Sequence, residues 1–426
     1  MNRGKGWKFC VVVVAAIAVL GMWARLGAQA AGSAGAGKAG ASATDWPSYR
    51  GPTADGISAE TGWRTDWDKT PPKQLWTLNV GKGYSSVAVV GGKVYAMGNV
   101  DDNNDTVWCL DAKTGKEIWK KSYACPSSKQ NPGPRSTPTV DGGLLYTVSR
   151  AGQIICWDAA NGDKRWEKSG PKDFGGKSGS WAFAGSATIS DKMVIVDVGV
   201  VVALDKFTGD VIWKSKGAWK AGYATPTLFT AGGKKLVAVF EADGLKALDL
   251  ATGDTVWECP WKTNYDVNAA NPVLVDGKFF ITSGYGVGCA MVDAEKGTEI
   301  WKGKTLASHY TTPVLYKGFL YGIHGSANQE GTSKGSVVCL DLEGKQKWSQ
   351  PGYGVGSLML ADGKLIILGE QGLLVIAEAS PDGFKKLAET KSIEKGICWT
   401  MPVLSGGVIY CRCMEGELVA LDVSGK

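Results

Sequence analysis

Apolar residues occur along this chain in short runs separated by Asp-Gly and Gly-Gly pairs, a pattern typical of β-hairpins. The segments from Thr137 to Tyr146 and from Thr312 to Tyr321 are two such hairpins. A second hairpin follows, in which a strand ends in Leu-Asp, a loop closes on Gly and a short strand ends in Trp, as from Ala203 to Trp213. The Asp can accept hydrogen bonds from turn amides, and the Gly can take positive φ. Two hairpins per unit predict a four-stranded propeller blade.

The second hairpin recurs every 37 to 48 residues, which indicates a repeat array. Its acidic residue occurs at eight positions, namely Asp111, Asp158, Asp205, Asp249, Asp293, Asp341, Glu378 and Asp422. Eight residues mark the fourth strands, namely Trp76, Trp119, Trp166, Trp213, Trp257, Trp301, Trp348 and, in the seventh unit, Leu387. The two sets match unit by unit, so the pattern predicts eight blades.

The two ends of the repeat region complement each other. The segment from Lys73 to Trp76 is a fourth strand with no blade before it, and the segment from Leu418 to Asp422 is a third strand with none after it. Joined, they complete an eighth blade and close the ring, which removes its open ends. The sequence therefore predicts an all-β fold, an eight-bladed β-propeller of four-stranded antiparallel blades over residues 73–426. A seven-bladed ring is the alternative if the unit that ends at Leu387 is not a blade.

The phrase from Ala203 to Trp213, Ala-Leu-Asp-x-x-Thr-Gly-x-x-x-Trp, resembles the pyrroloquinoline quinone (PQQ)-like repeat. The resemblance covers residues 73–426 and implies that the repeated Trp packs between neighbouring blades. It implies one of two functions, because one branch of the family comprises quinoprotein dehydrogenases and another comprises non-catalytic scaffolds similar to the outer-membrane assembly lipoprotein BamB. The segment Asp45 to Pro52 resembles the N-terminal arm of secreted members, so we expect an arm over residues 45–72.

The N-terminus has the composition of an export signal. Basic residues precede an apolar run from Phe9 to Trp23, and Ala28 to Ala30 offers a cleavage site, so residues 1–30 predict a signal peptide. An uncleaved membrane anchor is the alternative. Cys10 starts the apolar run instead of ending it, so we expect no lipid anchor. Residues 31–44 are mostly Ala, Gly, Ser and Thr and predict a flexible linker. We expect a periplasmic or extracellular protein, and a monomer.

The charge of the chain gives no indication of a nucleic-acid partner. The formal net charge is +6, from 47 basic and 41 acidic residues. Cleavage after Ala30 would remove Arg3, Lys5, Lys8 and Arg25 and no acid, which leaves 43 basic residues and a charge of +2. No basic run or stripe remains. Nucleic acid is therefore not an expected partner.

The cysteines favour buried thiols over disulfides. Cys109, Cys156 and Cys339 each lie two residues before the blade acid, where other blades carry Ala or Met. Small buried apolar sites explain this position, and disulfides are the alternative. Cys411 and Cys413 lie two apart on one predicted strand, and their separation suits a local disulfide poorly. There is no haem-attachment motif.

Residues just before each innermost strand of a propeller surround one mouth of its central channel. Three positions before the Pro of each unit they are Tyr84, Arg135, Ala184, Tyr223, Ala269, Tyr310, Val355 and Trp399, with Trp181, Asn268 and His309 nearby. An aromatic mouth with one Arg could hold a planar anionic ligand. The alternative is that bulky side chains plug the channel.

A dehydrogenase would require residues that these mouth positions do not provide. The resemblance implies Ca²⁺ held by Glu, Asn and Asp oxygens, an Asp base and, in many members, adjacent cysteines under the quinone. No two cysteines are adjacent here and no mouth position carries a carboxylate, so Asp266 and Asn268 are the nearest approximation to a metal pair. The insertions that build substrate walls are missing as well.

We therefore predict a non-catalytic scaffold that binds an envelope or outer-membrane protein, with no cofactor. One alternative is a PQQ- and Ca²⁺-dependent oxidoreductase that uses Arg135, Trp181, Asn268 and His309. A second alternative is a carbohydrate or peptide binder.

Overall fold

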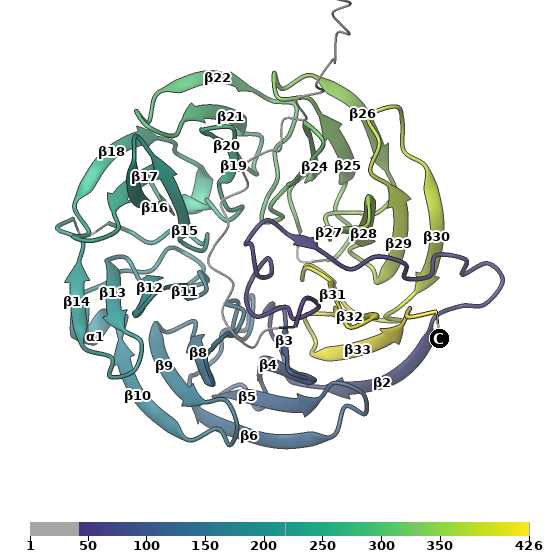
Figure 1. Cartoon of the computed structure of the whole chain (residues 1–426), viewed down its shortest axis with the longest axis horizontal. Coiled ribbons are helices and arrows are strands. Elements are labelled where there is room, and N and C mark those ends of the chain that lie inside the picture. The colour runs from purple at the N-terminus through teal and green to yellow at the C-terminus, as the bar shows by residue number, and fades with distance from the viewer. Residues whose placement is uncertain (1–41, 218, 329, 426) are drawn as a thin grey trace, which may run out of the picture. The chain divides into compact units, whose positions relative to one another are not determined.

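The computed structural model describes residues 42–217, 219–328 and 330–425, which belong to one compact unit. The predicted signal peptide and residues 31–41 of the predicted linker lie outside the described residues. The described part is built from eight sheets of antiparallel strands arranged around a central axis (Figure 1). Its helical content is one turn of α-helix, α1 (Gly170–Phe174), and one 3₁₀ turn, η1 (Asn264–Asp266). No helix among these residues is long and apolar enough to span a membrane.

The first four blades follow the chain in order, each from an inner to an outer strand. Blade 1 consists of β3 (Ala88–Val90), β4 (Lys93–Asn99), β5 (Asn104–Asp111) and β6 (Glu117–Ala124), and blade 2 of β7 (Thr139–Asp141), β8 (Leu144–Val148), β9 (Gln153–Asp158) and β10 (Lys164–Ser169). Blade 3 consists of β11 (Thr188–Ser190), β12 (Met193–Asp197), β13 (Val201–Asp205) and β14 (Val211–Lys214), and blade 4 of β15 (Thr227–Ala231), β16 (Lys234–Glu241), β17 (Gly244–Asp249) and β18 (Thr255–Pro260).

The other four blades complete the circle. Blade 5 consists of β19 (Val273–Val275), β20 (Lys278–Ser283), β21 (Gly288–Asp293) and β22 (Glu299–Gly303), and blade 6 of β23 (Val314–Tyr316), β24 (Phe319–His324), β25 (Ser336–Leu340) and β26 (Gln346–Pro351). Blade 7 contains β27 (Ser357–Ala361), β28 (Lys364–Leu368), β29 (Leu373–Glu378) and β30 (Lys386–Lys391), and blade 8 contains β31 (Val403–Ser405), β32 (Val408–Arg412), β33 (Glu417–Asp422) and β2 (Lys73–Asn79).

The ring closes as the sequence predicts. Strand β2 pairs antiparallel with β33, with Trp76 opposite Ala420, and forms the outer strand of blade 8. The irregular seventh unit is a blade, because β30 pairs with β29 although Leu387 stands where other units have Trp. The eight-bladed prediction is confirmed, and the seven-bladed alternative is wrong.

Blade 7 departs from the predicted four strands because the N-terminal arm adds one. Strand β1 (Ile57–Ser58) runs parallel to β27 on the inner edge of that sheet. The amide of Leu360 donates a hydrogen bond of 3.0 Å to the carbonyl oxygen of Gly56. The front-half pattern shows only the hairpin that each unit makes with itself, so it does not reveal an inner edge left free for a segment from elsewhere.

Each junction that carries a Trp uses the same contact. The indole N–H donates to a carbonyl oxygen in the turn of the next blade. At every one of these junctions except that of Trp348, a Gly of that turn lies against the ring. The seven donors and acceptors are Trp76 and Ala112, Trp119 and Ala159, Trp166 and Lys206, Trp213 and Leu250, Trp257 and Ala294, Trp301 and Leu342, and Trp348 and Ser380, at 2.8–3.2 Å. The acid of the turn accepts bonds from its amides, as Asp205 does from Phe207 and Thr208.

A second set of contacts links the blades around the axis. We call this set the inner ring. It consists of the residues before the Pro position in blades 1 to 6, namely Ser86, Thr137, Ser186, Thr225, Asn271 and Thr312. Each of the first five donates its backbone N–H to the side-chain oxygen of the next, at 2.8–3.3 Å. The indoles on the outer strands and the inner ring near the axis together hold neighbouring blades at both their outer and inner edges.

The N-terminal arm lies across one end of the channel (Figure 1). Trp46 pairs with Val89 of blade 1. The buried guanidinium of Arg50 donates to the carbonyl oxygens of Thr312 at 3.1 Å and Pro313 at 3.0 Å, next to blade 6. The arm thus joins blades that are far apart around the ring.

All nine cysteines from Cys109 to Cys413 within the described residues are free and buried. Cys109, Cys156 and Cys339 have no accessible surface and lie in the hydrophobic core. Burial raises the pKa of Cys109 and of Cys339 to about 11, so both thiols stay protonated at neutral pH. Cys10 lies outside the described residues.

Candidate functional site

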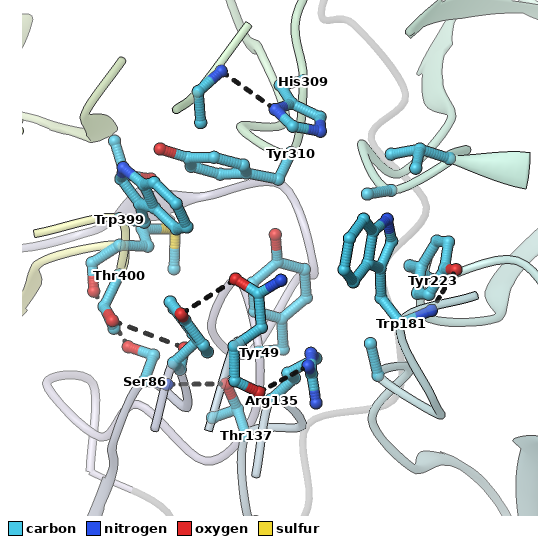
Figure 2. Close-up of a pocket in the computed structure, with 18 of the residues that line it drawn as sticks. Tyr49, Ser86, Arg135, Thr137, Trp181, Tyr223, His309, Tyr310, Trp399 and Thr400 are labelled. Carbon is cyan, nitrogen blue, oxygen red and sulfur yellow. Dashed lines mark hydrogen bonds between the residues drawn. The ribbon is translucent and has the colours of Figure 1, made fainter. Parts of the chain in front are cut away.

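A cavity of about 330 Å³ lies at the axis of the ring, among residues that precede the innermost strands. We call it the axial cavity. Nine of the eleven residues expected at the mouth line it, namely Tyr84, Arg135, Trp181, Ala184, Tyr223, Ala269, His309, Tyr310 and Trp399, whereas Val355 and Asn268 do not. Figure 2 shows Trp399 and Trp181 on opposite sides of the space, with Arg135 and Thr137 below. The volume falls within the range of about 300–1,000 Å³ that is usual for ligand pockets, so the channel is not plugged at this end.

The rim of the axial cavity is an almost continuous aromatic arc. Neighbouring rings lie 4.7–6.5 Å apart, centroid to centroid. In order around the arc they are Trp181, Tyr265, Tyr285, His309, Tyr310, Trp399 and Tyr84. Tyr84 and Trp399 are stacked, with an interplanar angle of 16°. Such spacings hold rings in place through mutual packing.

Arg135 is the one permanently charged side chain that lines the cavity. Its guanidinium donates to the carbonyl oxygens of Asn131 at 2.8 Å and Gly133 at 3.3 Å, and lies 5.8 Å from the ring centroid of Tyr84. It forms no salt bridge within the described part of the chain. Burial lowers the pKa of Arg135 to about 10, which still leaves the guanidinium charged at neutral pH.

His309 is neutral at physiological pH, because burial lowers its pKa to about 4. Its Nδ1 accepts a hydrogen bond of 3.0 Å from the amide of Ala327. The proton of the neutral ring is therefore on Nε2, which is a donor. His309 contributes a ring and one N–H to the cavity, and no charge.

Several lining residues were missed by sequence reasoning. Tyr49 comes from the N-terminal arm and lies at the cavity, within 3.4 Å of the hydroxyl of Thr312. Tyr285 follows β20, outside the repeated phrase. The hydroxyls of Ser86 and Thr137 also line the space. Ser86 and Thr137 could have been predicted from the sequence, because they occupy the repeated position before the Pro. Tyr49 lies outside the repeats, so no pattern indicates its place at the cavity.

Asn268 does not line the axial cavity, which corrects its place among the candidates. Its side chain is fully buried. The amide nitrogen donates to the carbonyl oxygens of Glu241 at 2.8 Å and Trp261 at 3.1 Å, and the amide oxygen accepts from Ser283 at 2.8 Å. These three side-chain hydrogen bonds anchor the loop that contains Asn268, so the amide does not face the cavity.

The suggested metal pair does not form a cation site. Asp266 forms an ion pair with Lys220, and Asn268 is used as described above. No group of three or more His, Cys, Asp and Glu side chains suited to a metal occurs within residues 42–217, 219–328 and 330–425. The donor set does not fit Ca²⁺, which takes several oxygen ligands including carboxylates.

The lining of the cavity also fits PQQ poorly. That quinone carries several carboxylates, and Arg135 alone among the lining side chains could neutralise one of them. No carboxylate lines the cavity to act as a base or to hold a cation. We therefore derive no redox chemistry from this site.

A family model described as outer membrane protein assembly factor BamB matches residues 58–129 and 103–350 of the chain. The chain belongs to the BamB family. BamB of Burkholderia pseudomallei is 25% identical over 359 residues, which cover 70% of this chain and 86% of that protein. The match spans most of both chains, so the likeness is not confined to a few blades.

Solved structures agree on the architecture of this BamB-family propeller. BamB from Moraxella catarrhalis has a TM-score of 0.60 at 18% identity, and covers 82% of this chain and 99% of its own. A quinohemoprotein alcohol dehydrogenase from Comamonas testosteroni has a TM-score of 0.68 at 14% identity, and covers 90% of this chain and 81% of its own. At such identities these likenesses show the fold alone.

Proposed function

We propose that this BamB-like propeller is a scaffold that binds another protein of the cell envelope, with a role in outer-membrane protein assembly and no reaction of its own. The family match supports this proposal, since the matched proteins are named for outer-membrane protein assembly. The donor set of the axial cavity also supports it, because it offers neither a base nor a cation site.

The outer strands of three consecutive blades offer a surface for such a partner. We call it the outer belt and define it by Phe207, Val211, Ile212, Val256 and Ile300, which are 42–57% exposed. These residues belong to β14, β18, β22 and the turn before β14, which are neighbours along the rim (Figure 1). Large exposed apolar side chains that gather on one face are typical of protein interaction sites.

The contrast with blades 2, 6 and 7 supports the choice of surface. Three of the five other outer strands carry a charge at the position of Ile212 and Val256, namely Arg165 in blade 2, Lys347 in blade 6 and Lys386 in blade 7. Blades 1 and 8 carry Ile118 and Leu75 there, but neither has an apolar neighbour on both sides as blade 4 does. Charged residues on an edge strand discourage pairing with other chains. Blades 3 to 5 lack this protection at the same position.

Export and domain boundaries complete the proposal. We propose that residues 1–30 direct export, that residues 31–44 link them to the folded part, and that the protein works in the periplasm or outside the cell without a lipid anchor. Thr44, at the end of the linker, is already bound to the propeller region, because the Ser405 hydroxyl donates to its carbonyl oxygen at 2.6 Å.

Co-isolation from cells tests the scaffold. The tagged protein and its Ile212→Asp/Val256→Asp variant would be purified from the envelope fraction of the cells that make it. We expect one envelope protein to accompany the unmodified protein and to be lost from the variant. Arg165→Asp, at the same strand position in blade 2, is the control and should retain the partner. Equal recovery of a partner with both variants would contradict the outer belt, and no specific partner in any sample would contradict the scaffold.

A further inference from the structure

The wall of the axial cavity keeps three hydrogen-bond donors that no described residue accepts. They are the remaining N–H groups of Arg135, the Nε2–H of His309 and the indole N–H of Trp181. Figure 2 shows all three residues around the cavity. A ligand that presents acceptors would complement this set.

Most other polar atoms at the rim are already engaged within the protein. The Tyr84 hydroxyl donates to Asn131 at 3.1 Å, and the indole N–H of Trp399 donates to Glu370 at 2.9 Å. The Tyr310 hydroxyl donates to the carbonyl oxygen of Val355. What these residues offer to a ligand is therefore ring surface, and a sugar or a peptide backbone would leave many of its own polar groups without partners, which is costly.

The charge of the cavity is one positive unit. Arg135 is charged, His309 is neutral and no carboxylate lines the space. Glu370 lies behind Trp399, and its carboxylate accepts from the amide and hydroxyl of Ser333 at 2.8 and 2.6 Å. One negative charge on a ligand would be balanced, and each further charge would be buried without a partner.

We propose that the axial cavity binds a planar aromatic monoanion, with its carboxylate at Arg135 and its ring system between Trp181 and Trp399. The two indoles supply apolar surface on opposite sides of the ring system, as Figure 2 shows for their placement. The guanidinium supplies a charge-assisted hydrogen bond to the carboxylate. This inference does not depend on the scaffold role, because the cavity lies at the axis and the outer belt on the circumference.

Calorimetric titration of the full-length protein tests the ligand class. Naphthoate is the probe, naphthamide is its neutral match, and cyclohexanecarboxylate is an anion without an aromatic ring. We expect naphthoate to bind at least about tenfold tighter than naphthamide, because a hydrogen bond to a charged group adds about that factor. It should also bind tighter than cyclohexanecarboxylate, because only naphthoate offers an aromatic ring system to the two indoles. Equal binding of naphthoate and naphthamide, or no binding of naphthoate at about millimolar concentration, would overturn the proposal. Tighter binding of PQQ with Ca²⁺ would also overturn it.

Two variants separate the charge from the ring surface. In Arg135→Gln, naphthoate and naphthamide should bind with similar affinity, because the charge is lost. In Trp181→Leu, both should bind several-fold more weakly while their ratio is kept. Arg165→Gln, an exposed arginine of blade 2, should change neither affinity. A melting curve would reveal whether Arg135→Gln folds. If it does not fold, the ratio of naphthoate to naphthamide affinity in the unmodified protein and in Trp181→Leu still tests whether the anion contributes to binding. A ratio near one in those two proteins would exclude a role of the anion.

Discussion

The indole N–H of Trp213 donates a hydrogen bond of 3.0 Å to the carbonyl oxygen of Leu250 in the next blade. Gly253, three residues further on, lies directly against the same indole, and a Cβ at Gly253 would be 2.3 Å from the ring. The Gly of the repeated phrase is therefore required both by its φ of 73° and by the Trp of the preceding blade. Sequence spacing alone explains only the first requirement.

Gly253→Ala should destabilise the fold more than a glycine change with the same backbone strain. Its Cβ would overlap Trp213, and overpacking of this kind costs about 1–3 kcal/mol. Gly286→Ala is the matched control, because its φ of 69° is nearly the same and a Cβ there would meet no atom within 4 Å. Urea unfolding of the two variants measures the difference. Equal losses would mean that the glycine is required by its turn and not by the tryptophan.

Thr312→Val should weaken the junction between blades 5 and 6. The hydroxyl of Thr312 accepts a hydrogen bond of 2.8 Å from the buried amide of Asn271, and valine keeps the shape but removes the acceptor. A buried donor left without a partner costs about 1–3 kcal/mol. Thr230→Val, at an exposed position of β15, is the control and should be nearly neutral. Thermal unfolding would reveal the difference, and equal melting temperatures would argue against a structural role of the inner ring.

Asp197 should make stability depend on pH. Burial raises its pKa from 3.8 to about 6, although the amide of Gly199 donates a bond of 2.9 Å to it. The folded state then holds more protons than the unfolded state between about pH 4 and about pH 6, so the free energy of unfolding falls as pH rises through this window.

Asp197→Asn should remove the part of that dependence that comes from Asp197, because the amide cannot ionise. The neighbouring Glu241, whose pKa burial also raises, should still contribute. Denaturant unfolding at about pH 4 and about pH 7 measures the dependence. Asp191→Asn, in an exposed turn of the same blade, should retain the profile of the unmodified protein. The burial of His309 acts in the opposite direction, since its lowered pKa makes the protein gain stability as pH rises from about 4 to 6.5. The difference between the variant and the unmodified protein is therefore the quantity to compare. A difference that stays constant with pH would contradict the assignment to Asp197.

The architecture could be predicted from sequence because each blade repeats the same local requirements. The seventh unit shows that the remaining requirements are sufficient, since it forms a blade although Leu387 replaces the Trp. Residues that come from unique segments could not be predicted. Tyr49 reaches the axial cavity through the N-terminal arm, and β1 joins blade 7 from the same arm.

Asn268 shows the reverse error. Its position near the first strand of a blade predicts a place at the mouth, but its loop turns the amide inward to satisfy buried carbonyl groups. A position relative to a repeat fixes where the backbone runs. The direction of a side chain in the preceding loop depends on its local hydrogen bonds, which no repeat encodes.

Site-specific photocrosslinking in living cells tests the scaffold most directly. A photoreactive residue would be placed at Ile212 or Val256 of the outer belt, and at Arg165 or Lys347 at the same strand position of other blades. The scaffold predicts a discrete adduct with one envelope protein from the two belt positions and none from the control positions. Absence of any discrete adduct from Ile212 and Val256, in cells where the protein is exported and folded, would contradict it.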